Sequence, residues 1–160
     1  MKNKDIDLYF DSALRLAEDA FFQEEVPVGA VIISKTGEIL SEAHNLKEKN
    51  NDVTAHAEIL AIKEAAKKIG SWRLTGCSII VTLEPCPMCL SAIAQSRIKN
   101  LYFGAYDKKG GALSLGYNFS SDSRLNHKFN IYGGFKHYEC STLLSNFFKR
   151  KRKNYRGQSF

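Results

Sequence analysis

The alternation of apolar and polar residues predicts a chain in which helices and strands follow one another. Residues 5–22 have the period of an amphipathic helix, with acids opposite an apolar face made of Phe10, Leu14, Ala17 and Phe21. After the break at Pro27, the apolar run 28–33 predicts a buried strand. A turn at 35–38 leads to a second strand at about 39–45.

Helical and extended patterns continue to alternate through the middle of the chain. Thr54 is in position to cap a helix at about 55–68, and Gly70 is in position to end it. The apolar, β-branched run 78–83 predicts a central strand. Pro87 suits the first turn of a helix at about 87–96, because a proline there sacrifices no hydrogen bond. A fourth strand is expected at 98–105.

The last third of the chain opens with a long loop region that starts at 107–111 and contains a possible strand at 131–132. A final helix is expected from about 138 to 152. This order of elements predicts a layered α/β fold with one mixed sheet. We therefore interpret residues 1–160 as a single domain with a basic C-terminal helix or tail from about 138.

Composition excludes several classes of protein. Apolar residues make up 44% of the chain and charged residues 25%, so disorder is not expected. The N-terminal segment carries acids and lacks the apolar stretch of a signal peptide. The longest apolar run, 28–33, is far shorter than the roughly 20 residues that span a bilayer. We expect a soluble, cytoplasmic protein without a membrane partner.

Charge is distributed unevenly along the chain. Residues 1–80 hold 10 Lys and Arg against 13 Asp and Glu, whereas residues 81–160 hold 13 against 4, so the halves carry −3 and +9. The densest cationic run is 149–153, Lys-Arg-Lys-Arg-Lys. Such a run is often only a solvated helix end, but the asymmetry of the halves also suggests a surface that faces a polyanion.

Two segments carry residues with the chemistry of a metal site. His56 is placed at the start of one predicted helix, and Cys86 and Cys89 open the next one directly after a strand. One imidazole and two thiolates suit tetrahedral Zn²⁺, and three protein ligands leave a fourth position for water. In a chain with only four cysteines, metal ligation by the close pair is favoured over a secreted disulfide framework.

Glu58 gives this metal site a possible reaction. It lies two residues after His56, so it can approach the metal-bound water without ligating the metal. Zinc lowers the pKa of such a water to about 7, and a nearby carboxylate can take its proton and pass it on. A lone Cys-x-x-Cys or His-x-Glu is a weak signal, but His-Ala-Glu followed by Pro-Cys-x-x-Cys after a strand is strong.

With these motifs the chain resembles the bacterial tRNA-specific adenosine deaminase family, within the cytidine-deaminase-like superfamily. The resemblance covers nearly the whole chain and includes segments outside the zinc motif: 26–31, 96–98, 103–107, 111–112, 126–127 and 140–148. It implies a three-layer α/β/α fold with a central five-stranded mixed sheet. It also implies a homodimer that deaminates adenosine at the wobble position of a transfer RNA anticodon, with an arginine transfer RNA as the expected substrate.

The resemblance also implies a role for each matching residue. His56, Cys86 and Cys89 would bind one zinc ion per subunit, and Glu58 would move protons. The substrate would be contacted by Asn45, the Ala57 backbone N–H, Val28, Pro85, Asp107, Phe148, Arg150 and Arg152. In this set Asn45, Ala57, Val28 and Pro85 would surround the flipped nucleotide, Asp107 would contact the neighbouring sugar, and the last three would follow the RNA along the final helix.

Two other functions use some of the same residues. A deaminase of a free base or nucleoside, such as guanine or cytidine, would share the zinc chemistry but has little use for a basic, aromatic C-terminal helix. A non-catalytic zinc protein that binds RNA would have no need of the unligated acid Glu58. The sequence therefore favours an RNA deaminase.

Overall fold

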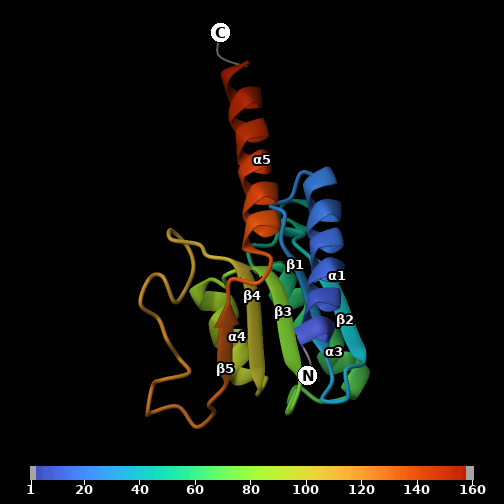
Figure 1. The fold of residues 1–160 in the computed structure, drawn as a ribbon, viewed down its shortest axis with the longest axis vertical. Coiled ribbons are helices and arrows are strands. Elements are labelled where there is room, and N and C mark those ends of the chain that lie inside the picture. The colour runs from blue at the N-terminus through green and yellow to red at the C-terminus, as the bar shows by residue number, and fades with distance from the viewer. Residues whose placement is uncertain (1–2, 158–160) are drawn as a thin grey trace.

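A computed structural model describes residues 3–157 and shows a central sheet with helices on both faces (Figure 1). The sheet has five strands in the order β2-β1-β3-β4-β5. Their bounds are β1 Gly29–Ile33, β2 Ile39–His44, β3 Ser78–Leu83, β4 Asn100–Ala105 and β5 Asn130–Gly133. The sheet is mixed, because β1 pairs antiparallel with β2 and β3, while β3, β4 and β5 are parallel.

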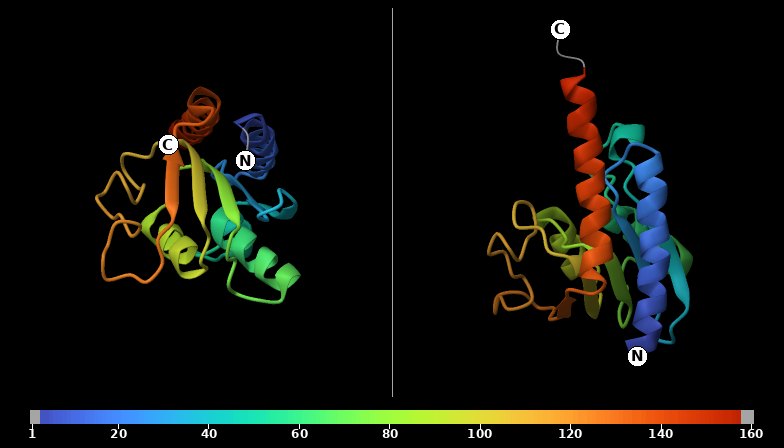
Figure 2. Two further views of the ribbon diagram at one scale, coloured as in Figure 1. Left: turned by 60° about the horizontal axis from the view of Figure 1, so that its bottom comes forward. Right: turned by 45° about the horizontal axis from the view of Figure 1, so that its top comes forward.

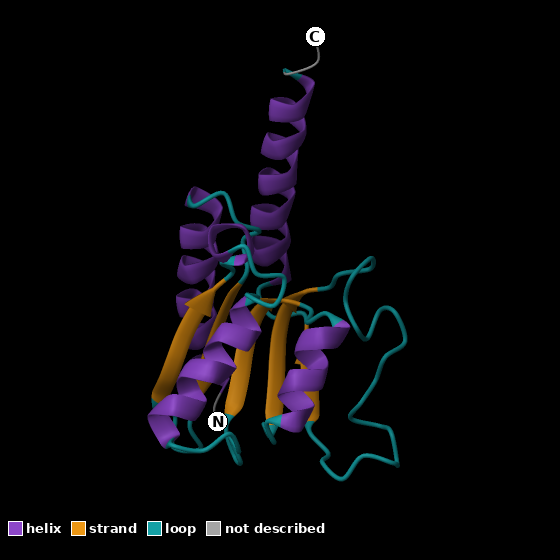
Figure 3. Ribbon diagram, turned by 180° about the vertical axis from the view of Figure 1, so that it is seen from behind, coloured by secondary structure: helices purple, strands orange, loops and turns teal. Residues whose placement is uncertain are grey.

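The helices form the two outer layers. Figure 1 shows α1 (Asn3–Phe22) and α5 (His137–Arg156) on one face of the sheet. Seen from behind in Figure 3, α3 (Ala57–Ile69) and α4 (Pro87–Gln95) cover the other face. A single short turn, α2 (Lys47–Asn50), lies between β2 and α3. The three-layer α/β/α architecture with a five-stranded mixed sheet is therefore confirmed.

The parallel pair β3 and β4 decides where a site can form. Parallel strands need a crossover connection, and α4 supplies it. Both strands therefore end at the same edge of the sheet, where Leu83 is paired with Ala105. The segments that follow β3 and β4 leave from this edge, which is where ligands bind in open α/β sheets.

The apolar side chains fill both spaces between the layers. Val31, Ile33 and Ile80 point toward α1, where they meet Phe10. Alternate residues of the same strands point toward α3 and α4 and join the larger core cluster. Gly29 is needed at its position, because a Cβ there would lie 2.0 Å from the Ala13 carbonyl oxygen of α1. Strand β1 is thus buried on both faces, as its uninterrupted apolar run predicts.

The predicted cap of α3 is wrong. Thr54 does not cap the helix, because its backbone N–H and its hydroxyl both donate to Asp52 Oδ1. The helix begins later, at Ala57, with His56 at the N-cap position. The final helix extends to Arg156, four residues past its predicted end, and the possible strand at 131–132 forms as β5. None of the helices in the described range 3–157 is long and apolar enough to cross a membrane.

Candidate active site

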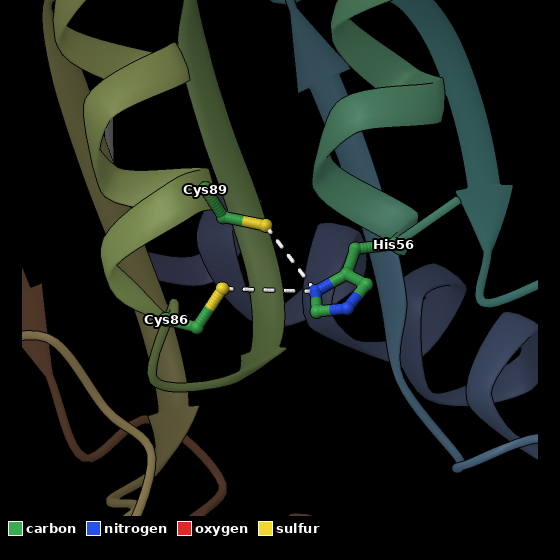
Figure 4. Close-up of side chains that lie close together, drawn as sticks. All are labelled: His56, Cys86 and Cys89. Atoms are coloured by element: carbon green, nitrogen blue, oxygen red, sulfur yellow. Dashed lines mark hydrogen bonds between the residues drawn. The ribbon is translucent and has the colours of Figure 1, made fainter. Parts of the chain in front are cut away.

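Three side chains from two helix starts converge at the edge of the sheet where β3 ends. The Nδ1 atom of His56 lies 3.7 Å from the sulfur of Cys86 and 3.5 Å from the sulfur of Cys89 (Figure 4). Their ligand atoms all lie within 4.8 Å of one another, and this group is the metal-ligand cluster found among the described residues. Sequence reasoning predicted these three ligands, and the structure brings them together.

The spacing of the three atoms fits a tetrahedral zinc ion. Zn–S bonds of about 2.3 Å and Zn–N bonds of about 2.0–2.1 Å, meeting at a tetrahedral angle, place nitrogen and sulfur about 3.6 Å apart. The two observed N···S distances, 3.5 and 3.7 Å, bracket this value. Two sulfurs and one imidazole are also the donor set that zinc prefers over harder cations.

Local structure explains why these residues meet. His56 and Cys86 are the N-cap residues of α3 and α4, with extended backbones, so both ligands stand where a strand or loop turns into a helix. Pro87 follows Cys86 at the first helical position, which needs no N–H donor. Cys89 then follows one turn into α4 and is fully buried.

In the metal-free protein the two cysteines titrate very differently. A hydrogen bond from Cys89 lowers the pKa of Cys86 to about 4, against the effect of burial, and His56 adds a second hydrogen bond. The pKa of Cys89 is raised because its thiol donates to Cys86 and is buried. The hydrogen bond with Cys86 also raises the pKa of His56. Cys86 is therefore a thiolate at neutral pH, whereas Cys89 keeps a proton that a metal would have to displace.

Glu58 is a buried acid next to this cluster. It lies in the first turn of α3, and only 4% of its surface is exposed. Burial raises its pKa from 4.5 to about 7, although the charge of His56 and hydrogen bonds from its own backbone N–H and from Cys89 act in the opposite direction. A carboxyl group with this pKa can both accept and release a proton near neutral pH.

Asn45 connects the end of β2 to the start of α3. Its Oδ1 accepts a hydrogen bond of 2.8 Å from the Ala57 N–H, and its own N–H donates to the carbonyl oxygen of Val28. Asn45 thereby satisfies one of the N–H groups that the first turn of a helix leaves without a partner. Three residues that the resemblance assigns to the nucleotide are thus joined directly to one another.

Glu84 is a buried acid that sequence reasoning missed. One of its carboxylate oxygens accepts from the Ser114 N–H at 2.7 Å, and the other from the Asp107 N–H and the Ser114 hydroxyl at 2.9 and 2.7 Å. Gly111 is needed beside it, because a Cβ there would lie 2.3 Å from Glu84 Cδ. The Ala112 N–H also donates to the carbonyl oxygen of Pro85. The segment that carries Cys86 and the loop after β4 are therefore fastened together.

A cavity of about 910 Å³ opens between the loop after β4 and helix α5. Asp107, Phe148 and Arg152 line it, as do Tyr106 and Lys149. Its other lining residues are Val26, Leu83, Ala105, Lys108, Lys109, Gly110, His137, Ser141, Leu144 and Ser145. Three of the predicted substrate residues thus share one cationic, partly aromatic groove.

Arg150 is the predicted substrate residue that the structure places elsewhere. It is absent from the walls of the cavity, and its guanidinium group donates to the carbonyl oxygen of Phe21 in α1.

Glu25 is another residue that sequence reasoning missed, because its neighbours in the chain look like a surface loop. Its buried carboxylate accepts the N–H groups of Glu48 and Lys49 at the start of α2. Only burial of an acid in the folded chain reveals such a residue.

The fold and the metal-ligand cluster beside a buried glutamate define a deaminase of the cytidine-deaminase-like class. The chain matches the family of MafB19-like deaminases over residues 4–152. It is 44% identical over 147 residues to the tRNA-specific adenosine deaminase of Bacillus subtilis, covering 92% of this chain and 91% of the relative. It is 48% identical over 145 residues to that of Aquifex aeolicus, covering 89% and 93%. The chain belongs to the tRNA-specific adenosine deaminase family.

Solved structures agree with this placement. A structure from work on A-to-I editing by tRNA:A34 deaminases at the wobble position of transfer RNA matches with a TM-score of 0.81 and 41% identity, covering 86% of this chain and 99% of that one. The guanine deaminase of Nitrosomonas europaea matches with a TM-score of 0.74, covering 88% and 83%, but at 19% identity it shares only the fold.

Proposed function

We propose that this chain is a zinc-dependent hydrolytic deaminase that converts adenosine to inosine at the wobble position of a transfer RNA anticodon, with an arginine transfer RNA as substrate. The observation that carries the proposal is the buried Glu58, with its pKa raised to about 7, beside the His56, Cys86 and Cys89 cluster. The reaction consumes one water and releases one ammonia for each adenosine. Membership of the family supports transfer RNA as the substrate class.

His56 Nδ1 and the sulfurs of Cys86 and Cys89 would hold the zinc ion. When bound, zinc would act as a Lewis acid that lowers the pKa of a water molecule, so that this water could lose a proton and serve as the nucleophile near neutral pH. Glu58 is not one of the metal ligands and acts as the general acid and base that transfers protons. It accepts a proton from the attacking water, delivers one to the ring nitrogen, and assists the departure of the amino group as ammonia.

Asn45, Val28, Ala57 and Pro85 would hold the extruded base. The Asn45 side chain is oriented by the hydrogen bond that its Oδ1 accepts from the Ala57 N–H. The amide NH₂ of Asn45 is therefore the group that can donate a hydrogen bond to a nucleotide. The direct contact of the Ala57 N–H with the base stays a prediction. Extrusion is needed because the amino group of a stacked base is out of reach of a buried site.

The groove beside α5 would hold the RNA that flanks the base. Phe148 offers a stacking surface, and Lys149 and Arg152 offer charges to phosphates. Asp107 would face a sugar hydroxyl. Its Oδ1 accepts the N–H groups of Lys109 and Gly110, so the carboxylate is held in place before RNA arrives.

We also propose that residues 1–160 act as one deaminase domain whose basic C-terminal helix is part of the RNA site. We propose that the chain acts as a homodimer, as the resemblance to the family implies. With transfer RNA as the substrate, we expect the reaction in the cytoplasm.

The test is to incubate the zinc-loaded protein with an arginine transfer RNA anticodon stem-loop that carries A at the wobble position. Parallel reactions use the same stem-loop with G at that position, and free adenosine, cytidine and guanine. We expect inosine only in the first RNA, detected by mass spectrometry of its nucleosides, and none with Glu58→Ala. Deamination of a free base with untouched RNA would instead assign the chain to the free-base deaminases.

A further inference from the structure

Arg150 lies within the cationic run 149–153 but faces away from the groove. Its Nη2 atom lies 2.9 Å from the Phe21 carbonyl oxygen and 2.8 Å from Glu24 Oε1. The guanidinium carbon also stacks 4.0 Å above the centre of the Phe21 ring. Arg152, which lines the groove, is two residues further along α5 and therefore about 200° around the helix. The two arginines thus contact different surfaces.

The contacts of Arg150 lie at the C-terminal end of α1. The Phe21 carbonyl belongs to the last turn of that helix, where carbonyl groups have no partner within the helix. A cation at this end also interacts favourably with the helix dipole. Figures 1 and 2 show α5 running beside this end of α1 and then away from the sheet. The part of α5 that extends past the sheet is therefore held by contacts with the C-terminal end of α1.

Glu24 completes the attachment from the turn that follows α1. Its second oxygen lies 2.9 Å from the Nζ of Lys151, so one carboxylate bridges two cations of α5. The backbone of Glu24 has a φ of 63°, in the left-handed region that is unusual for a residue other than glycine. This conformation reverses the chain at the end of α1, next to the contacts with α5.

The same turn leads directly to a wall of the groove. Two residues after Glu24, Val26 lines the same cavity as the side chains of α5. On α5, Phe147 packs edge-on against Phe21 at 5.8 Å and against Phe148, a groove residue, at 5.4 Å. The contacts between Glu24, Arg150 and Phe21 therefore fix α5, one wall of the groove, relative to α1 and to the turn that leads to Val26.

We propose that Arg150 and Glu24 form a clasp that positions α5 on α1 and sets the width of the RNA groove. Arg150 is then a positioning residue, in place of the direct RNA contact that the resemblance implies. The proposal rests on the proposed function for its effect on RNA, whereas the clasp itself exists in the free protein. It also divides the cationic run by role. Arg150 and Lys151 are paired with Glu24, and Lys149 and Arg152 line the groove.

Arg150→Lys tests the clasp without changing charge. A lysine can still attract a phosphate, but it has no planar fork to reach Phe21 and Glu24 together or to stack on the ring. We expect the KM and the Kd for the anticodon stem-loop to rise about 5- to 10-fold, with kcat changed less than about 2-fold. Arg15→Lys is the matched control, because Arg15 lies on α1 and donates to Ser12. It should leave both constants unchanged.

Limited trypsin digestion of the RNA-free protein supplies a second readout. Trypsin cleaves after lysine and arginine alike, so Arg150→Lys preserves every cleavage site. We expect cleavage within 149–153 to become at least about 5-fold faster, because a released helix end opens more often. Arg152→Lys should not change this rate, because Arg152 lines the groove and is not part of the contacts with α1 and Glu24.

Glu24→Gln distinguishes a positioning role from a purely electrostatic one, because the two predict opposite changes in RNA affinity. Removing an acid beside a cationic helix should strengthen RNA binding if only charge matters. Loosening of the clasp should instead weaken binding and speed the trypsin cleavage. Tighter binding by Glu24→Gln, or an Arg150→Lys protein with wild-type trypsin resistance, would overturn the proposal. If the wild type leaves RNA adenosine intact, the proposed function fails, while the trypsin comparison still tests the clasp.

Discussion

Replacing Glu58 by glutamine should stabilise the metal-free protein while abolishing its proposed activity. The pKa of Glu58 is raised to about 7 from 4.5, mainly by burial. Between these two pH values the folded chain holds a proton that the unfolded chain has released. Folding stability contributed by this group therefore falls as pH rises through this window. Above pH 7 the folded protein contains a buried carboxylate, which costs free energy.

The magnitude follows from the same two values. The interval from 4.5 to about 7 corresponds to about 3 kcal/mol at 1.36 kcal/mol per pH unit. Glutamine is similar in shape and carries no charge at any pH. The difference in free energy of unfolding between Glu58→Gln and the wild type should thus be near zero at pH 4.5, grow through the window, and level off near 3 kcal/mol above pH 7.

The assay is urea unfolding at pH 5, 6, 7 and 8 with a chelator present, because a bound cation would change the pKa of Glu58. Glu64→Gln is the control, since Glu64 lies on the exposed side of the same helix and pairs with Lys67. It should change stability by less than about 0.5 kcal/mol at every pH. A Glu58→Gln protein with no gain at pH 8 over pH 5 would refute the argument from burial.

Three other predictions concern the surroundings of Glu58. Cys86→Ala should lose zinc and lower the melting temperature of the zinc-loaded protein to that of the chelator-treated wild type, and stoichiometric zinc by atomic absorption would remove Cys86 from the ligand set. Glu84→Gln should cost about 1–3 kcal/mol, because an amide NH₂ would face the Asp107 N–H, and should raise the KM for RNA with zinc retained. Ser41→Ala is the control, because it also removes a buried hydrogen bond but on β2, away from the loop after β4, and it should leave the KM unchanged. Equal KM values for Glu84→Gln and Ser41→Ala would count against the role of Glu84. Arg152→Ala should reduce the slope of log Kd against log salt by about 0.7–0.9, and an unchanged slope would mean that Arg152 contacts no phosphate.

The parts of the fold with a strong local pattern could be predicted from the sequence. The run 28–33 is apolar at every position and forms a strand buried on both faces. The start of α4 is specified by Pro87, and Cys86 directly before it becomes the N-cap residue. The metal ligands could be predicted because the same short segments that carry them also begin the helices. Their convergence then follows from the positions of two helix starts.

Features that depend on distant partners could not be predicted. Thr54 has the chemistry of a cap, yet its hydroxyl donates to Asp52, and Asn45, the residue directly after β2, accepts the hydrogen bond from the Ala57 N–H instead. Arg150 is indistinguishable from Arg152 in a cationic run until α1 is in place beside it. The roles of buried acids such as Glu84 likewise become visible only when the loop after β4 is folded against them.

The hydrogen bond between Asn45 and Ala57 gives Asn45 a structural role in addition to its proposed contact with the substrate, so selection for either role conserves the residue. With Asn45 in its proposed role, a mutation there that changed nucleotide recognition would also leave the Ala57 N–H without its acceptor, at the helix start that carries His56 and Glu58. Lineages that acquire new substrates are therefore expected to keep Asn45 and to vary the exposed groove residues, such as Lys108 and Lys109, where a substitution disturbs little else. Divergence of specificity in this architecture should accumulate at the rim of the groove.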